Sequence, residues 1–161
     1  MKKNTKIFLI MVSLALLVFT LESCKTDTVE QPSPLGPSSI AIILDLNANP
    51  NVIVAGQLDR QTVEITATLK RYDGNPISDR AILFEVVNID GRRLNLGYLD
   101  GELSMQTVAT DAGGTALTHY YGPLKKEIRS NTDLYIRATV VWEGEQFIQD
   151  TTQLYIIRDD N

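Results

Sequence analysis

The sequence predicts an all-β sandwich, preceded by an export signal and a short proline-rich linker. Apolar and polar residues alternate strictly over 62–70, which places one row of side chains on a core and the other in water. Turn signals rich in glycine, asparagine, aspartate and proline recur between short β-branched runs, and no stretch has a convincing helical period. Seven or eight short strands of this kind are typical of two packed antiparallel sheets.

The first 23 residues have the layout of a secretory signal. Three lysines give a basic start, an apolar run follows over 7–21, and Ser23 is a small residue directly before Cys24. The apolar run is shorter than the about 20 residues that span a bilayer core, and Glu22 closes it. We therefore expect cleavage between Ser23 and Cys24 rather than a retained membrane span.

Cleavage makes the chain more acidic. The whole sequence has 15 basic and 20 acidic residues, and removal of 1–23 takes away three lysines and one glutamate, which leaves 12 basic and 19 acidic residues and a net charge of −7. A nucleic-acid-binding protein needs a basic face to neutralise phosphates, so this class is excluded. Electrostatic attraction to anionic lipid headgroups is disfavoured for the same reason.

The segment 24–38 is predicted to be a flexible linker. It contains Pro32, Pro34 and Pro37 among serine, threonine, glutamine and glycine, a composition that favours extended conformations over packing. The remaining 39–161 has the length of one ordinary domain. Because the chain has a single cysteine, no internal disulfide stabilises this domain.

The strands of the domain can be placed in order from the turns between them. The first and second are separated by Asn49-Pro50-Asn51, and later turns carry Asp-Gly pairs that suit positive φ. The last strand is polar on both faces over 149–153, so we expect it to carry a bulge or to lie at a sheet edge, and the register of the final hairpin stays open. The expected strands are 40–46, a short piece at 52–54, 62–70, 81–87, 94–99, 103–110, 115–121, 134–142 and 146–157.

The alternation also predicts which side chains form the core. The inward rows are expected to be Val63, Ile65, Ala67 and Leu69; Ile82, Phe84 and Val86; and Leu134, Ile136, Ala138, Val140 and Trp142.

Leu21-Glu22-Ser23-Cys24 resembles the lipobox of bacterial lipoproteins, except that Glu22 stands where the family usually has a small or apolar residue. The resemblance implies that Cys24 becomes the mature N-terminus and carries lipid, palmitate included, on its sulfur and amine. Several acyl chains on one residue give stable membrane anchoring. It also implies an outer-membrane location, with the cell surface and the periplasm both open as the side on which the domain lies.

Several segments over 38–158 resemble a bacterial immunoglobulin-like domain of the invasin and intimin type. This resemblance implies a Greek-key sandwich that serves as a spacer or a binding module at a cell surface, and it implies no catalytic residues. The family usually works in tandem arrays, whereas one domain is present here. The matching segments are Val63-Glu64-Ile65-Thr66-Ala67-Thr68-Leu69-Lys70, Asp73-Gly74-Asn75-Pro76-Ile77, Ile82-Leu83-Phe84-Glu85-Val86, Thr110-Asp111-Ala112-Gly113-Gly114-Thr115-Ala116, Tyr120-Tyr121-Gly122-Pro123 and Ile136-Arg137-Ala138.

The residue types that catalysis requires do not gather in this sequence. His119 is the only histidine and lies inside an expected strand, Cys24 lies outside the domain, and no serine sits in a nucleophile-elbow motif. We therefore expect no enzymatic activity and no cofactor.

Aspartates in the expected loops raise the question of calcium, which prefers several converging oxygen ligands. No loop has the alternating aspartate pattern of a calcium loop, and Asp-Gly turns explain these residues without a metal. We therefore expect no metal site. The aspartates are Asp73, Asp79, Asp90, Asp100 and Asp111.

The outward rows of the strands suggest a binding patch. Alternation directs Tyr121, Tyr135, Leu83 and Val87 away from the core, and together they would form an aromatic and apolar surface for a protein or glycan partner. Scattered outward apolar residues are also normal for a soluble protein. The sequence thus favours a non-catalytic, lipid-anchored envelope protein that mediates adhesion or docking. The alternative is a structural accessory or spacer subunit of a periplasm-facing complex.

Overall fold

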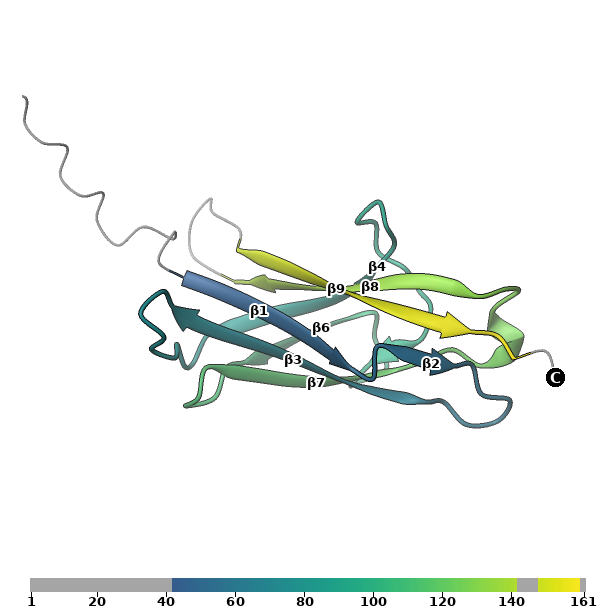
Figure 1. The fold of residues 1–161 in the computed structure, drawn as a ribbon. Coiled ribbons are helices and arrows are strands. Elements are labelled where there is room, and N and C mark those ends of the chain that lie inside the picture. The colour runs from purple at the N-terminus through teal and green to yellow at the C-terminus, as the bar shows by residue number, and fades with distance from the viewer. Residues whose placement is uncertain (1–41, 142–147, 160–161) are drawn as a thin grey trace, which may run out of the picture. The chain divides into compact units, whose positions relative to one another are not determined.

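A computed structural model describes residues 42–141 and 148–159 of the chain (Figure 1). The expected signal at 1–23, the linker at 24–38 and Cys24 lie outside the described residues, as does Trp142.

The described residues form nine strands in two sheets. One sheet has the order β1-β3-β7-β5 and the other has the order β2-β9-β8-β4-β6. All neighbouring strands are antiparallel except β2 and β9, which are parallel. The elements are β1 (Ile42–Asn49), β2 (Val52–Val54), β3 (Thr62–Arg71), β4 (Ala81–Val87), β5 (Tyr98–Leu99), β6 (Met105–Ala109), β7 (Thr115–Tyr121), a short 3-10 helix η2 (Lys125–Glu127), β8 (Thr132–Val140) and β9 (Gln149–Ile157).

The strand order is that of an immunoglobulin-like Greek-key sandwich, as predicted. The strands β1, β3 and β7 take the places of A, B and E, while β4, β8 and β9 take those of C, F and G in the facing sheet (Figure 1). The described part of the chain has nine strands rather than seven or eight, because the short piece expected at 52–54 forms a strand of its own, β2, which joins a different sheet from β1. The expected strand at 94–99 pairs as a strand only over Tyr98–Leu99.

The core lies between the two sheets and is built from the predicted rows. All four inward residues of β3 have 0% exposure, and the inward residues of β4 and β8 meet them from the facing sheet. Each fully buried aliphatic or aromatic side chain stabilises the fold by about 1.5–3 kcal/mol relative to its exposed state. The buried members of the predicted rows are Val63, Ile65, Ala67, Leu69, Ile82, Phe84, Val86, Leu134, Ile136, Ala138 and Val140.

The final hairpin has one continuous register, from Thr139 opposite Gln149 to Thr132 opposite Ile156, so the expected bulge is absent from it. The expectation of an edge is confirmed for its first half, because β2 pairs with β9 only over 155–157. The polar residues there have a structural use. The Asp150 carboxylate accepts a hydrogen bond from the Leu46 N–H of β1 at 2.9 Å.

The turn between β6 and β7 explains the spacing of Asp111, Gly114 and Ala116 in the sequence. Oδ1 of Asp111 accepts hydrogen bonds from the N–H groups of Gly113 and Thr115, at 2.8 and 2.9 Å. Gly114 has φ +74°, and its carbonyl oxygen accepts a hydrogen bond from the Leu69 N–H at 2.8 Å. The turn therefore fixes the start of β7 against β3.

Replacement of this glycine tests the close approach. In Gly114→Ala the new Cβ would overlap with the Leu69 carbonyl oxygen, so we expect the free energy of unfolding to fall by more than about 2 kcal/mol. Gly74→Ala is the matched control, because Gly74 has φ +87° and no atom within 4 Å of an added Cβ. It should lose only about 1 kcal/mol through left-handed strain. Urea unfolding measures both, and equal losses would contradict the packing described at Gly114.

Candidate functional site

Aromatic and charged side chains gather where β5 meets the end of β7. We call Arg60, Tyr98, Asp100, His119 and Tyr121 the tyrosine cluster. Tyr98 and Tyr121 are paired across the two strands, with ring centroids 5.1 Å apart and an interplanar angle of 28°. The guanidinium carbon of Arg60 lies 5.1 Å from the Tyr98 ring centroid, a cation–π distance. The cluster is therefore an ordered stack of one cation and two rings.

Asp100 holds the cluster together. Its Oδ1 accepts a hydrogen bond from the Tyr121 hydroxyl at 3.1 Å, and its Oδ2 accepts one from the His119 N–H at 2.9 Å. Nδ1 of His119 lies 3.1 Å from the same Oδ2, and the Thr118 hydroxyl lies 3.3 Å from it. Partial burial opposes ionisation of Asp100, but these hydrogen bonds outweigh it and lower the pKa of the carboxyl. The bond to Asp100 raises the pKa of Tyr121.

The position of Arg60 is fixed from the loop that follows β7. Its Nη1 donates to the Gly122 carbonyl oxygen at 2.8 Å, and its two terminal nitrogens reach the Glu127 carboxylate at 2.7 and 2.9 Å. The bidentate hydrogen bonds raise the pKa of Arg60 and lower the pKa of Glu127. Arg60 is thus oriented over Tyr98 before any ligand binds.

The carboxylate of Asp100 is committed to the cluster. Each of its two oxygens already accepts a hydrogen bond from a cluster residue. What the cluster offers is flat ring area with polar edges, held rigidly at the protein surface.

The cluster lies at one end of the sandwich. Tyr121 pairs with Thr62 at the start of β3, whereas Ile42 pairs with Arg71 at its other end. The ten residues of β3 separate these ends by about 30 Å at the usual rise per residue. Ile42, the first described residue, therefore lies at the end of the sandwich opposite the tyrosine cluster.

The structure divides the four residues of the predicted binding patch between two faces. Tyr121 belongs to the outer face of the sheet that contains β7, whereas Leu83, Val87 and Tyr135 belong to the outer face of the facing sheet. Val87 lies directly opposite Tyr135, but it has only 1% exposure and offers no accessible surface. One continuous patch does not form, and a binding role for the exposed members stays a prediction.

A buried ion pair network separates Leu83 from Tyr135. Glu85 has 7% exposure, and its carboxylate accepts hydrogen bonds from Arg137 at 2.7 and 3.1 Å and from Arg93 at 2.9 Å. Burial opposes ionisation of Glu85, but the two arginines outweigh it and lower the pKa. Sequence reasoning missed this network because alternation predicts an exposed residue here, and the covering Arg93 comes from a later loop.

The loop aspartates serve as turn residues. Asp73 accepts hydrogen bonds from the Asn75 N–H at 3.0 Å and from its side-chain amide at 2.8 Å. Asp79 has φ +57°, a conformation that aspartate tolerates better than most residues. Among residues 42–141 and 148–159, no three acidic, histidine or cysteine side chains come together to hold a metal ion.

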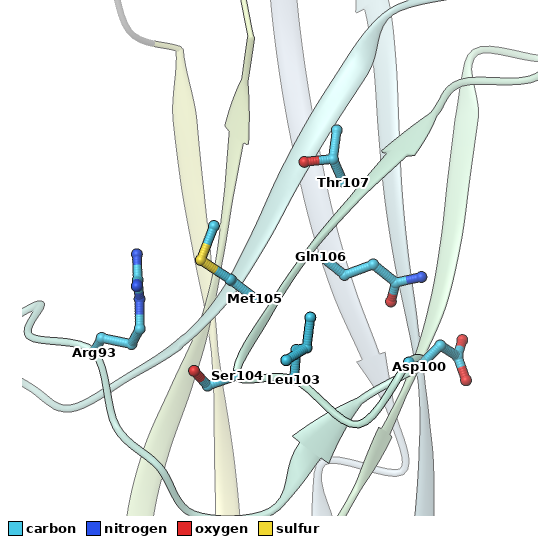
Figure 2. Close-up of a pocket in the computed structure, with 8 residues that line it drawn as sticks. Arg93, Asp100, Leu103, Ser104, Met105, Gln106 and Thr107 are labelled. Atoms are coloured by element: carbon cyan, nitrogen blue, oxygen red, sulfur yellow. The ribbon is translucent and has the colours of Figure 1, made fainter.

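An open pocket of about 620 Å³ lies beside β6 (Figure 2). The side chains of Met105 and Gln106 point to opposite sides of the strand there, and Gln106 turns toward the side of Asp100. Oε1 of Gln106 accepts a hydrogen bond from the Thr118 hydroxyl at 2.7 Å, which joins β6 to β7 across the sandwich. The pocket is lined by Arg93, Asp100, Gly101, Leu103, Ser104, Met105, Gln106 and Thr107.

Within the described residues, no helix is both long enough and apolar enough to span a membrane.

Comparison with known proteins gives similarity to solved structures alone. No protein-family model matches the sequence, and no curated protein matches it. The periplasmic chaperone SfaE is 6% identical, with a TM-score of 0.45 over 70% of this chain and 57% of the chaperone. The Escherichia coli chaperone DraB is 10% identical, with a TM-score of 0.44 over 71% of this chain and 55% of the chaperone.

A third similar structure is AggA, the major subunit of aggregative adherence fimbriae type I from Escherichia coli. It is 11% identical, with a TM-score of 0.42 over 72% of this chain and 94% of AggA. This chain thus spans just over half the length of the two chaperones and nearly all of AggA. At these identities and TM-scores the similarity assigns no function, ligand or partner to this chain.

The Glu85 network predicts a pH-dependent loss of stability. Because the folded pKa of Glu85 lies below its ordinary value of 4.5, its contribution is complete above that value and is lost as pH falls through the folded pKa. Glu85→Gln should lower the free energy of unfolding at pH 7 by about 1–3 kcal/mol. The loss relative to wild type should shrink in acid. Denaturant titrations at pH 7 and at an acidic pH measure this loss, with Glu64→Gln at an exposed position as the control. A loss that does not change with pH would refute the role of the Glu85 carboxylate.

Proposed function

We propose that this chain is a non-catalytic, lipid-anchored protein of the bacterial outer membrane, and that its immunoglobulin-like domain docks to a protein or glycan through the tyrosine cluster. The observation that carries the proposal is the position of the cluster, at the end of the sandwich opposite Ile42. An N-terminal anchor joins the domain at the Ile42 end, which leaves the opposite end free to contact a partner.

The anchor is supported by the sequence before the sandwich. A basic start, an apolar run and Leu21-Glu22-Ser23-Cys24 resemble a lipoprotein signal, and the 24–38 linker separates the lipid from the folded domain. The likeness to invasin and intimin domains supports a role at the cell surface, since that family supplies spacers and binding modules.

The docking role is supported by the preorganisation of the cluster. Aromatic side chains supply a large contact area and dominate many binding interfaces. The Tyr121 hydroxyl is held by Asp100, and the Tyr98 ring contacts both Arg60 and Tyr121. A partner therefore binds side chains that have already lost much of their conformational entropy, which favours affinity.

The non-catalytic role is supported by the hydrogen bonds of Asp100. A general base needs an accessible lone pair and a pKa near the working pH, whereas both oxygens of this carboxylate accept hydrogen bonds from Tyr121 and His119 and its pKa is lowered.

The lipid anchor can be tested by substitution of the single cysteine. Cys24→Ala should abolish incorporation of a fatty-acid label into the chain, because it removes the side chain that carries the lipid. Ser23→Ala is the matched control, because alanine keeps a small residue before the cysteine, and its labelling should match wild type. Labelling that survives Cys24→Ala would refute the anchor.

The docking role can be tested on arrays of glycans and extracellular proteins probed with the purified full chain. For any ligand that wild type binds, Tyr98→Ser and Tyr121→Ser should each weaken affinity by about tenfold or more, since each removes part of the aromatic stack. Tyr155→Ser is the control, because Tyr155 is 37% exposed on β9 and lies outside the cluster. Circular dichroism checks that each variant is folded. Unchanged binding by both cluster variants would contradict the docking role and favour a spacer.

A further inference from the structure

The two sheets have four edge strands, and β6 differs from the other three. The edges β2 and β5 have only three and two residues. The edge β1 is partly covered, because the Leu46 N–H donates to Asp150 at 2.9 Å. By contrast, β6 is five residues long, and among the described residues no segment pairs with its outer side. It is the edge most open to another strand.

The backbone groups that face outward on β6 follow from its pairing with β4. The Val86 N–H donates to the Ser104 carbonyl oxygen at 2.9 Å, and the Thr110 N–H donates to the Arg80 carbonyl oxygen at 2.8 Å. Since hydrogen-bonding direction alternates along an antiparallel strand, the N–H and C=O groups of Gln106 and Val108 also face β4. The N–H and C=O groups of Met105, Thr107 and Ala109 therefore point away from the sheet.

The side chains of β6 do nothing to discourage pairing. Natural edge strands are usually protected by lysine, proline, a bulge or an inward charge. The run over 103–110 is Leu-Ser-Met-Gln-Thr-Val-Ala-Thr, with no charge and no proline. Its register with β4 is continuous from Ala81 opposite Ala109 to Glu85 opposite Met105, so no bulge twists it away. Leu103, at the start of this run, is 60% exposed.

We propose that β6 pairs with β6 of a second copy of this chain, antiparallel, about a two-fold axis that passes beside Thr107. The outward groups at 105, 107 and 109 are symmetric about Thr107, so Met105 of each copy meets Ala109 of the other and Thr107 meets Thr107. The pairing joins two five-stranded sheets into one continuous sheet. A closed two-fold arrangement of this kind is the commonest symmetry of protein oligomers.

Charge complementarity at the two ends of β6 favours a second copy as the occupant. Arg93 forms an isolated bridge with Val87 of β4. If the β6 register continued, residue 103 would lie opposite Val87, so Arg93 occupies that position beside β4. In the two-fold arrangement, position 103 of one copy lies opposite position 111 of the other. Asp111 of the second copy therefore comes to the end of β6 where Arg93 lies, and symmetry repeats this opposite-charge pair at the other end. No like charges face each other along the strand between them.

The open pocket beside β6 is lined in part by Leu103, Met105 and Thr107, whose exposed surface the second copy would cover (Figure 2). Strand addition usually combines main-chain hydrogen bonds with pockets that receive alternate side chains, and both are present at this edge. The residues that pair, Met105, Thr107 and Ala109, are not members of the tyrosine cluster, so the two proposals fail independently.

The test is the oligomeric state of the full chain, purified in mild detergent and measured by native mass spectrometry over a concentration series. Wild type should be dimeric. Thr107→Lys places two like charges opposite each other at the axis and should weaken the dimer by about tenfold or more. Thr107→Pro should do the same, because it removes an outward N–H without breaking a bond to β4.

Asn47→Lys is the matched control, since Asn47 is exposed on β1 and the substitution adds the same charge at another edge. It should dimerise like wild type. A monomeric wild type, or a dimer that Thr107→Lys and Thr107→Pro leave intact while both variants remain folded, would overturn the proposal.

Discussion

The contact between the inward row of β3 and the facing rows of β4 and β8 is the constraint on which the rest of the structure depends. Each row alone is an apolar stripe on a strand, and only the opposite sheet removes it from water. The turns with strained or left-handed residues, such as the one at Gly114, are maintained because this core fixes the strands that they connect. The same closure leaves the ends and edges of the sandwich to carry interactions.

The ends and the edges have separate assignments. The tyrosine cluster occupies the end opposite Ile42 and depends on rings held in place by Asp100 and Arg60. The proposed pairing of β6 depends on its outward-facing backbone groups and on its uncharged sequence. Aromatic docking recognises side-chain shape, whereas strand addition recognises the main chain and tolerates many side chains. The two proposals thus assign different kinds of recognition to different parts of the sandwich.

Local pattern predicted the fold because the information is local. The alternation in 62–70 predicted the inward row of β3, and Asp111-Ala112-Gly113-Gly114 marked the turn between β6 and β7 from residues adjacent in sequence. The outward direction of Tyr121, Tyr135 and Leu83 also follows from alternation.

Sheet membership does not follow from local pattern. Tyr121 was expected beside Tyr135, but β7 and β8 belong to different sheets. The burial of Val87 and Glu85 depends on a loop that returns with Arg93, and the tyrosine cluster combines Arg60 with residues about 40–60 positions later. Such long-range pairings leave no periodic signal in the sequence, so neither the cluster nor the open edge could be read from it.

The most direct test of the docking account is site-specific photo-crosslinking in living cells. A photoreactive residue at position 62 lies directly opposite Tyr121 and leaves the tyrosine cluster intact, and one at position 68 lies on the same sheet face toward the opposite end. The account predicts a discrete crosslinked partner from position 62 and none from position 68. No adduct at position 62, or the same adducts at both positions, would contradict it.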